Sequence, residues 1–455
     1  NPMEHEMTST DTLGSLQQRL PELDWITSKV HIKRLSRDFY WFSPMLVPQL
    51  ADKLADLVVK PRNEAELSAL VGCCVELGVP MTVRGGGTGN YGQAVPLAGG
   101  VVIDMTACTD LQWLCDGLVR VQAGMKLGEL ETRVREQRWE LRCMPSTYRA
   151  ASIGGLFAGG FGGIGSINYG PISTSGTVQA IRVLTIEQTP RVLELRGEEL
   201  LTYHHTYGTN GILLDLELAL APARDWDEYL LDFATIETAY GFCRTLLDAA
   251  GIEKRELSLY DSKAASYFRD IPFEQPDGHY LVMALVAPHT RQPLAQFLAE
   301  IGGGQVWMQT FAEAQASGLT LMEHCWNHST LQALKHDKSV TNLQTNYAAE
   351  RVLEQLADLK ALVGDEVLTH LEFIRLGNGQ PLITGLPLVR YSSDERLHEV
   401  MALHESLGIK INNSHTFLLE DGKHGGSLSP AILASKAAND PHSLLNPGKM
   451  RSLSV

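Results

Sequence analysis

Short apolar runs alternate with amphipathic stretches through the first half of the chain. The run at 57–61 predicts a strand, and apolar positions at helical spacing from Glu64 to Leu77 predict a helix. Asn63 suits the N-cap of this helix, and Gly78 suits its end. The same patterns predict a helix at 127–138 and strands at 80–84, 100–104, 118–122, 178–186, 190–196 and 212–220. Pro222 then marks a domain boundary.

Strands and helices follow a different order after Pro222. They are predicted as strand 229–233, helix 236–249, strands 255–260 and 279–287, helix 293–301 and strand 305–310. This βαββαβ order predicts a ferredoxin-like antiparallel sheet with helices on one face. Helices at 351–362 and 394–407 and strands at 367–375 and 382–390 come next. We therefore divide the chain into an N-terminal arm (1–45), a first domain (46–222), a second domain (223–410) and a C-terminal segment (411–455).

Charge and composition narrow the class of protein. The 455 residues carry 38 Lys and Arg against 53 Asp and Glu, a net charge of −15, which argues against a nucleic-acid partner. No apolar stretch reaches the roughly 18 residues of a membrane-spanning helix. The 7 scattered cysteines do not form a disulfide framework, so we expect a cytoplasmic protein. The chain has 41 glycines, more than is usual, and the excess is concentrated in two short segments.

The first glycine-rich segment runs from Arg84 to Gly92. It contains Gly87-x-Gly89-x-x-Gly92, the spacing of a dinucleotide fingerprint, but that motif requires a helix to open at the loop. No helix fits before the strand at 100–104, so a nicotinamide-binding Rossmann unit is disfavoured. Glycine backbone can instead turn successive N–H groups toward one anion, which suits a pyrophosphate. A merely tight loop is the alternative.

The second segment, 145–170, has eight glycines between 154 and 170. It includes Gly160-x-Gly162-x-x-Gly165, and we expect no helix after it. Small and hydroxylic residues can line a flat, uncharged ligand through backbone contacts. A disordered linker is the alternative, but interleaved large apolar residues favour burial: Ile153, Leu156, Phe157, Phe161 and Ile164.

In this order the segments resemble the FAD-binding domain of the vanillyl-alcohol oxidase/p-cresol methylhydroxylase (PCMH-type) flavoprotein superfamily. The matching motifs are Arg-Gly-Gly-Gly-Thr-Gly (84–89), Val-Val-Ile-Asp-Met (101–105), Val-Gln-Ala-Gly (121–124), Pro-Ser (145–146), Ala-Ser-Ile-Gly-Gly (151–155), Gly-Gly-Ile-Gly-Ser (162–166), Gly-Ile (211–212) and Asn-Pro-Gly-Lys (446–449). The likeness covers about 55–222 and 411–450. It implies an α+β protein in which a two-subdomain FAD-binding domain is joined to a substrate (cap) domain and the C-terminal segment returns to the FAD-binding domain.

The resemblance also implies cofactor-binding residues. Those for the pyrophosphate would be Arg84, Gly85, Gly86, Gly87, Thr88, Gly89 and Gly92. Those along the ribityl chain and ring would be Pro145, Ser146, Ser152, Ile153, Gly154, Gly155 and Gly162, with Ile212 and Asn446 nearby. Many members attach FAD through a His in the first loop, where this chain has Thr88, or through a Cys near the second, where only Cys143 is close. We therefore predict non-covalent FAD.

The resemblance places the substrate between the flavin and the second domain, so we expect a catalytic base from residues 323–420. His324 and His328 are spaced to share a helix face, and His370 and Glu372 to share a strand face with Arg375 on the other. Further candidates are His415, Tyr347, Tyr391, Arg390, His336 and Lys335. We expect a catalytic role for His370, His415, Tyr347, Arg375 or Tyr391. Related 2-hydroxy-acid dehydrogenases carry a Glu-His-Gly motif and a metal, which Glu420-x-x-x-His424-Gly425 only loosely resembles, so we expect no metal.

The resemblance implies an FAD-dependent oxidoreductase that oxidises an alcohol or 2-hydroxy acid by hydride transfer to flavin N5. The flavin would be reoxidised by O2 or another electron acceptor. We expect a small-molecule substrate, no nucleic acid and no membrane span, and the chain could form a homo-oligomer. A flavin-binding protein without turnover and a nicotinamide-dependent dehydrogenase are the alternatives.

Overall fold

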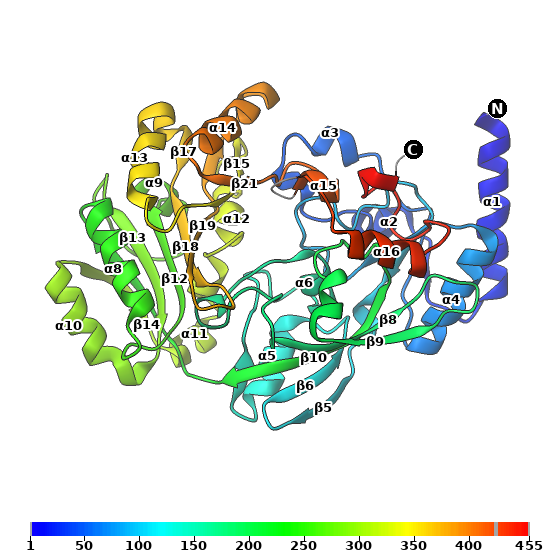
Figure 1. Ribbon diagram of the computed structural model, residues 1–455, viewed down its shortest axis with the longest axis horizontal. Helices are drawn as coiled ribbons and strands as arrows, with labels where there is room; N and C mark the ends of the chain where they lie inside the picture. The colour runs from blue at the N-terminus through cyan, green and yellow to red at the C-terminus, as the bar shows by residue number, and fades with distance from the viewer. Residues whose placement is uncertain (1, 423–425, 454–455) are drawn as a thin grey trace.

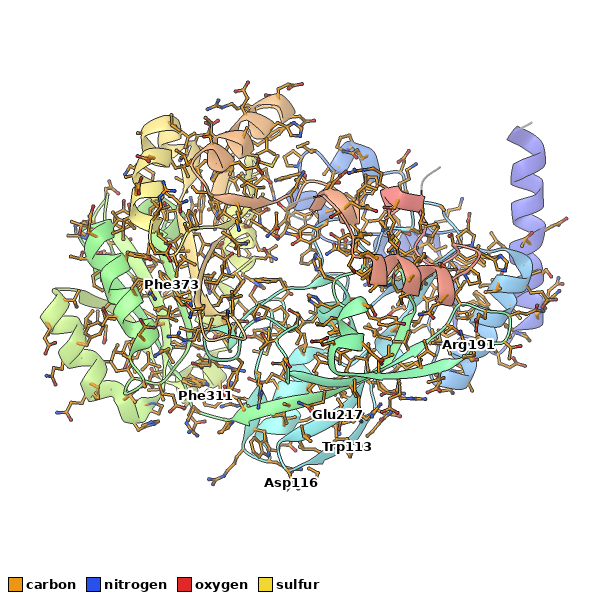
Figure 2. All side chains as sticks on the ribbon, viewed as in Figure 1. Trp113, Asp116, Arg191, Glu217, Phe311 and Phe373 are labelled. Carbon is orange, nitrogen blue, oxygen red and sulfur yellow. The ribbon has the colours of Figure 1, made fainter. Side chains whose placement is uncertain are left out.

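The computed structural model describes residues 2–422 and 426–453. It consists of two lobes (Figure 1). One lobe holds the N-terminal half and the C-terminal segment, and the other is the cap formed after Pro222. The long strand β10 (Ile212–Pro222) leads from the first lobe toward the second. Phe373 is buried within the cap, whereas Trp113 lies at the outer edge of the first lobe (Figure 2).

A small, mainly parallel sheet forms the first subdomain of this lobe. Its strand order is β1 (Trp25–Ile26), β2 (Leu57–Val59), β4 (Val101–Asp104) and β3 (Met81–Arg84). Helix α4 (Glu64–Leu77) joins β2 to β3, and its N-cap Asn63 accepts a hydrogen bond from Glu66 N at 2.9 Å. Gly78 ends the helix with a left-handed φ of 68°. The predicted helix and both of its ends are confirmed.

An antiparallel sheet forms the second subdomain. Its strand order is β5 (Leu111–Cys115), β6 (Leu118–Gln122), β10, β8 (Val178–Leu184) and β9 (Val192–Arg196), and β7 (Trp139–Leu141) pairs with the end of β10. Helix α5 (Leu127–Arg135) packs beside it, shorter than the predicted 127–138. Strands β5 and β7 were not predicted.

The cap is built on an eight-stranded antiparallel sheet. Its first four strands lie in the order β14 (Gly304–Gln309), β11 (Asp227–Phe233), β13 (Tyr280–Val286) and β12 (Lys254–Asp261), which is the ferredoxin-like arrangement expected from the βαββαβ pattern. The sheet continues through β18 (His370–Arg375), β19 (Pro381–Gly385), β16 (Gln344–Asn346) and β21 (Lys410–Asn412). A three-stranded sheet joins β15 (Val340–Asn342), β20 (Leu388–Arg390) and β17 (Val367–Leu368).

Helices cover one face of the large cap sheet and leave the other to face the first lobe. The covering helices are α8 (Ile236–Asp248), α10 (Arg291–Ile301), α13 (Val352–Val363) and α14 (Asp394–Ser406), whose apolar residues share one core cluster with the sheet. The opposite face contributes Tyr260 and Ile374 to a core shared with the first lobe. Short helices complete the cap: α9 (Ser262–Ala265), α11 (Phe311–Ser317) and α12 (His328–Leu334).

Helices occur in the second glycine segment and in the N-terminal arm. The second glycine segment includes α6 (Ile153–Gly159) and α7 (Ser166–Tyr169), so the expectation of no helix after Gly165 is wrong. Ser152 caps α6 by accepting from Gly155 N at 3.1 Å, and Leu156 and Phe157 are buried, which stabilises a helix that glycine alone disfavours. The N-terminal arm contains α1 (Pro2–Arg19) and α2 (Lys29–Leu35), and α3 (Val47–Leu50) follows it.

The C-terminal segment packs against the first lobe (Figure 1). It carries α15 (Leu419–Gly422) and α16 (Pro430–Asn439), and Leu445 forms a parallel bridge with Met81 at the start of β3. Among the described residues, no helix combines the length and apolarity that crossing a membrane requires.

Candidate functional site

A cavity of about 460 Å3 lies where the two glycine segments meet each other and the cap. No helix occurs between Arg84 and Val101, which removes the context of a Rossmann fingerprint. Twelve of the predicted cofactor residues line the cavity: Arg84, Gly85, Gly86, Gly87, Thr88, Gly89, Pro145, Ser152, Gly154, Gly155, Gly162 and Ile212. Motifs in the sequence therefore identified most of the cavity wall that the two glycine segments form.

Close packing of the two loops explains some of the glycines better than ligand contact does. A Cβ on Gly86 would lie 2.6 Å from the carbonyl carbon of Ala150, and one on Gly85 would lie 2.9 Å from Ser152 Cβ. Neither position has room for a side chain. Gly87, by contrast, has a φ of 66° and so needs glycine for its backbone conformation.

Buried polar atoms in this wall have no partner in the protein. Arg84 donates through Nη1 to Leu35 O at 3.0 Å and to Arg37 O at 2.6 Å, but its Nε is buried and unpaired. Asn90 Nδ2 is also buried and unpaired, although Asn90 lines the cavity. A buried donor without an acceptor is costly, so these atoms fit a ligand that accepts hydrogen bonds, as a pyrophosphate does.

The C-terminal segment holds the first glycine loop in place. Lys449 is fully buried, and its Nζ donates to Gly92 O at 2.8 Å, Gln93 O at 2.9 Å and Val95 O at 2.9 Å. Asn446 Nδ2 donates to Gln93 O at 2.9 Å. Burial lowers the pKa of Lys449 to about 7, against the attraction of Asp38.

Four predicted cofactor residues do not line the cavity. Gly92 and Asn446 support the loop through the bonds to Lys449 and Gln93, while Ser146 and Ile153 are buried beneath the surface. These four residues thus lie beside or behind the cavity wall, and their direct contact with the cofactor stays a prediction.

Residues 204–207, just before β10, were not among the predicted site residues. His204, His205 and Tyr207 line the cavity together with Tyr91. His205 and Tyr207 have positive φ values of 52° and 57°, a conformation that costs non-glycine residues energy and clusters at functional sites. The adjacent His-His pair followed by Tyr-Gly just ahead of a buried strand was the available signal.

The cap contributes the opposite wall. It presents Trp326, Asn327, Gln344, Asn346, Thr384 and Asn412 to the cavity. A Cβ on Gly162 would lie 3.3 Å from the Trp326 ring, so the indole contacts the second glycine segment. Gln344 Nε2 donates to Tyr91 Oη and links the cap to the first loop. Burial raises the pKa of Tyr91 to about 12, so its hydroxyl keeps its proton at neutral pH.

None of the five predicted catalytic residues lines the cavity. Arg375 binds Asp248 at 2.6 Å on the helix-covered face, and Tyr391 donates to Asp394 at 2.5 Å. Tyr347 is buried in the helix-side core.

His370 and His415 are also held by protein groups. His415 contacts Ser43 Oγ at 2.6 Å and Asn342 O at 2.7 Å, which anchors its loop between the two lobes. His370 lies behind the cap wall. These five side chains bond or pack against protein groups away from the cavity wall, and a catalytic role for any of them stays a prediction.

The other histidine candidates are separated by local structure. His328 starts α12, whereas His324 precedes it and contacts Asp270 at 2.8 Å, so the expected shared helix face is wrong. In the described part of the chain, no three His, Cys, Asp or Glu residues converge as metal ligands would. His424 and Gly425 lie outside the described residues.

A buried acidic network supports Trp326 from behind. Its indole Nε1 donates to Glu256 at 3.1 Å, and its backbone N donates to Glu372 at 3.3 Å. Glu372 contacts His370 Nε2, and His370 Nδ1 contacts Ser329 Oγ at 2.8 Å. The predicted common face of His370 and Glu372 is confirmed. Burial raises the pKa of Glu372 to about 8 and lowers that of His370 to about 3.

We expect Glu372→Gln to flatten the pH dependence of stability between pH 5 and 8. In this range the unfolded chain releases a proton that buried Glu372 keeps, so the wild-type free energy of unfolding falls as pH rises. Because Gln does not titrate, the variant should be more stable than wild type at pH 8, by the order of 2–3 kcal/mol. Thermal unfolding at several pH values measures this. Glu405→Gln, at an exposed site, is the control, and parallel profiles for all three proteins would contradict the expectation.

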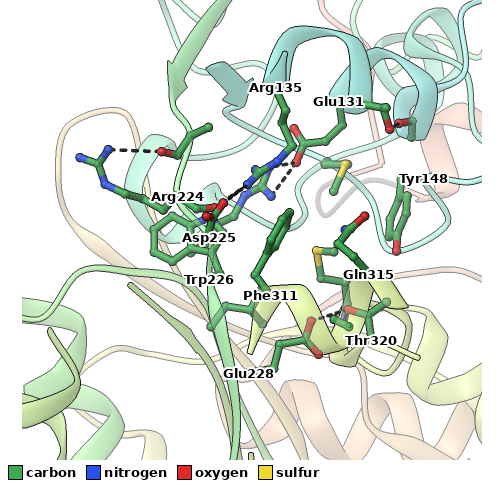
Figure 3. Close-up of a pocket in the computed structure, with 18 of the residues that line it drawn as sticks. Glu131, Arg135, Tyr148, Arg224, Asp225, Trp226, Glu228, Phe311, Gln315 and Thr320 are labelled. Carbon is green, nitrogen blue, oxygen red and sulfur yellow. Dashed lines mark hydrogen bonds and ion pairs between the residues drawn. The ribbon is translucent and has the colours of Figure 1, made fainter. Parts of the chain in front are cut away.

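A larger cavity of about 1330 Å3 lies at the domain junction, between α5, residues 222–226 and α11 (Figure 3). Arg255 pairs there with Glu131 at 2.7 Å, and the Arg135 guanidinium lies 4.6 Å from the Phe311 ring centre. Because these charged groups already have protein partners, we interpret the cavity as part of the junction, and we place the functional site at the glycine segments.

The site is a cavity lined by two glycine segments and by the cap. A family model described as "FAD binding domain" matches residues 55–192. The chain is similar to the D-lactate dehydrogenase of Archaeoglobus fulgidus, 33% identical over 28% of each chain, and to the glycolate oxidase subunit GlcD of Bacillus subtilis, 23% identical over 87% of this chain and 89% of that one. Its fold is that of a solved alkyldihydroxyacetonephosphate synthase, with a TM-score of 0.73 and 17% identity over 97% of this chain and 85% of that chain.

The fold and site thus define an FAD-binding protein. Residues 55–192 match an FAD-binding domain, as the resemblance to the vanillyl-alcohol oxidase/p-cresol methylhydroxylase superfamily implies, and FAD is the cofactor. The match to the archaeal D-lactate dehydrogenase spans only 28% of that protein's length.

Proposed function

We propose that this chain oxidises a small CH–OH donor, an alcohol or 2-hydroxy acid, with FAD as acceptor. One observation carries the proposal: the cap wall closes the same cavity that the two glycine segments line, so a donor held by the cap meets the cofactor. The names of the D-lactate dehydrogenase and glycolate oxidase relatives support a hydroxy-bearing donor. Reoxidation by O2 or another acceptor, a cytoplasmic location and a homo-oligomer stay predictions.

The protein's part in this reaction is binding, orientation and exclusion of water. Bound FAD would supply the two-electron acceptor chemistry. Arg84 and Asn90 would meet the pyrophosphate, and the backbone of 152–155 would line the rest of the cofactor. Trp326 and Leu386 cover the cavity from the cap and displace water. Side-chain amides of the cap wall, such as those of Gln344 and Asn346, orient the donor.

The test is anaerobic addition of candidate donors to the purified yellow protein. We expect the visible flavin absorption to bleach with at least one alcohol or hydroxy acid. A flavin that chemical reductants bleach but no donor does would contradict the proposed oxidation and favour a flavin-binding protein without turnover.

We also expect the FAD to be non-covalent. Thr88 occupies the position of the attaching His of some relatives, and its hydroxyl accepts from Thr147 Oγ1 at 3.3 Å. Cys143 is buried against Ser166, and burial raises the pKa of its thiol to about 11. Acid precipitation should leave a colourless pellet and a yellow supernatant, whereas a yellow pellet would contradict this.

A further inference from the structure

The cap wall of the cavity is unusually rich in side-chain amides. Strand β16 places Gln344 and Asn346 on one face, because side chains two apart point the same way. Register pairs Gln344 with Asn412 on β21 and Asn346 with Thr384 on β19, and paired residues share a face. Strand pairing therefore assembles three carboxamides and a hydroxyl into one patch, and all four line the cavity.

Several of these amides have unused hydrogen-bonding capacity. Within the described residues, no protein group bonds the side-chain amides of Asn346 and Asn412. Asn327 stands at the N-cap of α12 without capping it, and its Oδ1 is buried with no partner. Each carboxamide can donate two hydrogen bonds and accept two, which matches the dual character of a hydroxyl group.

Trp326 completes the wall with an aromatic surface. The indole is mostly buried, and Glu256 fixes its Nε1 at 3.1 Å. An aromatic ring beside a cluster of amides suits a molecule with C–H groups on one side and several hydroxyls on the other.

We propose that the donor is hydroxyl-rich: a polyol, sugar or sugar acid whose additional hydroxyls bind the amide patch of Asn327, Gln344, Asn346 and Asn412. This rests on the proposed oxidation. A donor with a single hydroxyl, such as lactate, would leave most of these amides unpaired in a closed site, and sites built for hydroxyls discriminate strongly against analogues that lack them. Lys410, opposite Asn346, is exposed beside the patch and would distinguish a sugar acid from a neutral polyol.

The experiment uses the full-length holoprotein with sorbitol, gluconate, D-lactate and glycolate. Anaerobic flavin bleaching gives the half-saturating concentration of each compound, and calorimetric titration gives its binding independently of turnover. We expect sorbitol or gluconate to bind at least tenfold more tightly than D-lactate or glycolate. If gluconate binds more tightly than sorbitol and Lys410→Met removes this difference, the donor is a sugar acid. If the wild-type protein binds gluconate and sorbitol equally, the donor is a neutral polyol.

The diagnostic variant is Asn346→Leu, with Asn378→Leu in the exposed β18–β19 turn as the matched control. We expect Asn346→Leu to weaken binding of the hydroxyl-rich compound at least tenfold and to leave lactate binding within twofold; the control should change neither. Tighter binding of lactate or glycolate, or equal losses for all compounds, would overturn the inference while leaving the proposed oxidation intact. Tight binding of a hydroxyl-rich compound without bleaching would overturn the oxidation alone.

Discussion

Gly86→Ala is expected to deprive the protein of most of its FAD. The new Cβ would lie 2.6 Å from the Ala150 carbonyl carbon, and because that atom is backbone, the two loops have to move apart. Overpacking of this kind costs about 1–3 kcal/mol. Since both loops line the cofactor cavity, we expect FAD affinity to fall about 10–100-fold.

Fluorescence titration of the apoprotein with FAD measures this loss. Gly241→Ala is the matched control, because a Cβ at Gly241 in α8 meets no atom within 4 Å. Replacing a glycine inside a helix should stabilise the protein by about 0.5–1 kcal/mol and leave FAD binding unchanged. Unaltered FAD affinity in Gly86→Ala would show that the loops do not pack as described.

Lys449→Met is expected to destabilise the FAD-binding lobe by about 3–5 kcal/mol, the usual cost of removing one partner from a buried charged network. The substitution leaves three backbone carbonyls, those of Gly92, Gln93 and Val95, without their donor. It also removes the positive charge near Asp38, whose pKa burial already raises to about 6, so that carboxyl should become still harder to ionise.

Urea unfolding and the FAD content of the purified variant measure the effect of Lys449→Met. Lys53→Met, on an exposed side chain, controls for the loss of charge. Equal unfolding midpoints for the two variants would show that the C-terminal segment does not stabilise the first glycine loop.

Local patterns predicted the parts of the fold that local forces determine. Helix α4 was predicted with both ends because Asn63 and Gly78 act within one turn of it. Helix α6 was missed because its glycines have low helix propensity, and its stability comes from the burial of Leu156 and Phe157 against distant residues.

The candidate site likewise has a part that local sequence motifs predict and a part that they do not. Most cofactor residues lie in two continuous segments and could be recognised by motif. The cap wall combines Trp326 and Asn327, which precede α12, with residues of strands β16, β19 and β21, and only the tertiary fold brings these segments together. The predicted catalytic residues were chosen by chemical type, which says nothing about the groups that already bond them, such as Ser43 and Asn342 at His415.

The hydrogen bond between Lys449 and the first glycine loop can form only late in protein synthesis. Lys449 and Gly92 are 357 positions apart, so the N-terminal half leaves the ribosome long before its anchor exists. The nascent chain carries every glycine of the cofactor motifs yet has none of the C-terminal bonds that fix the loop. We therefore expect stable binding of FAD only after residues through Lys449 have been synthesised.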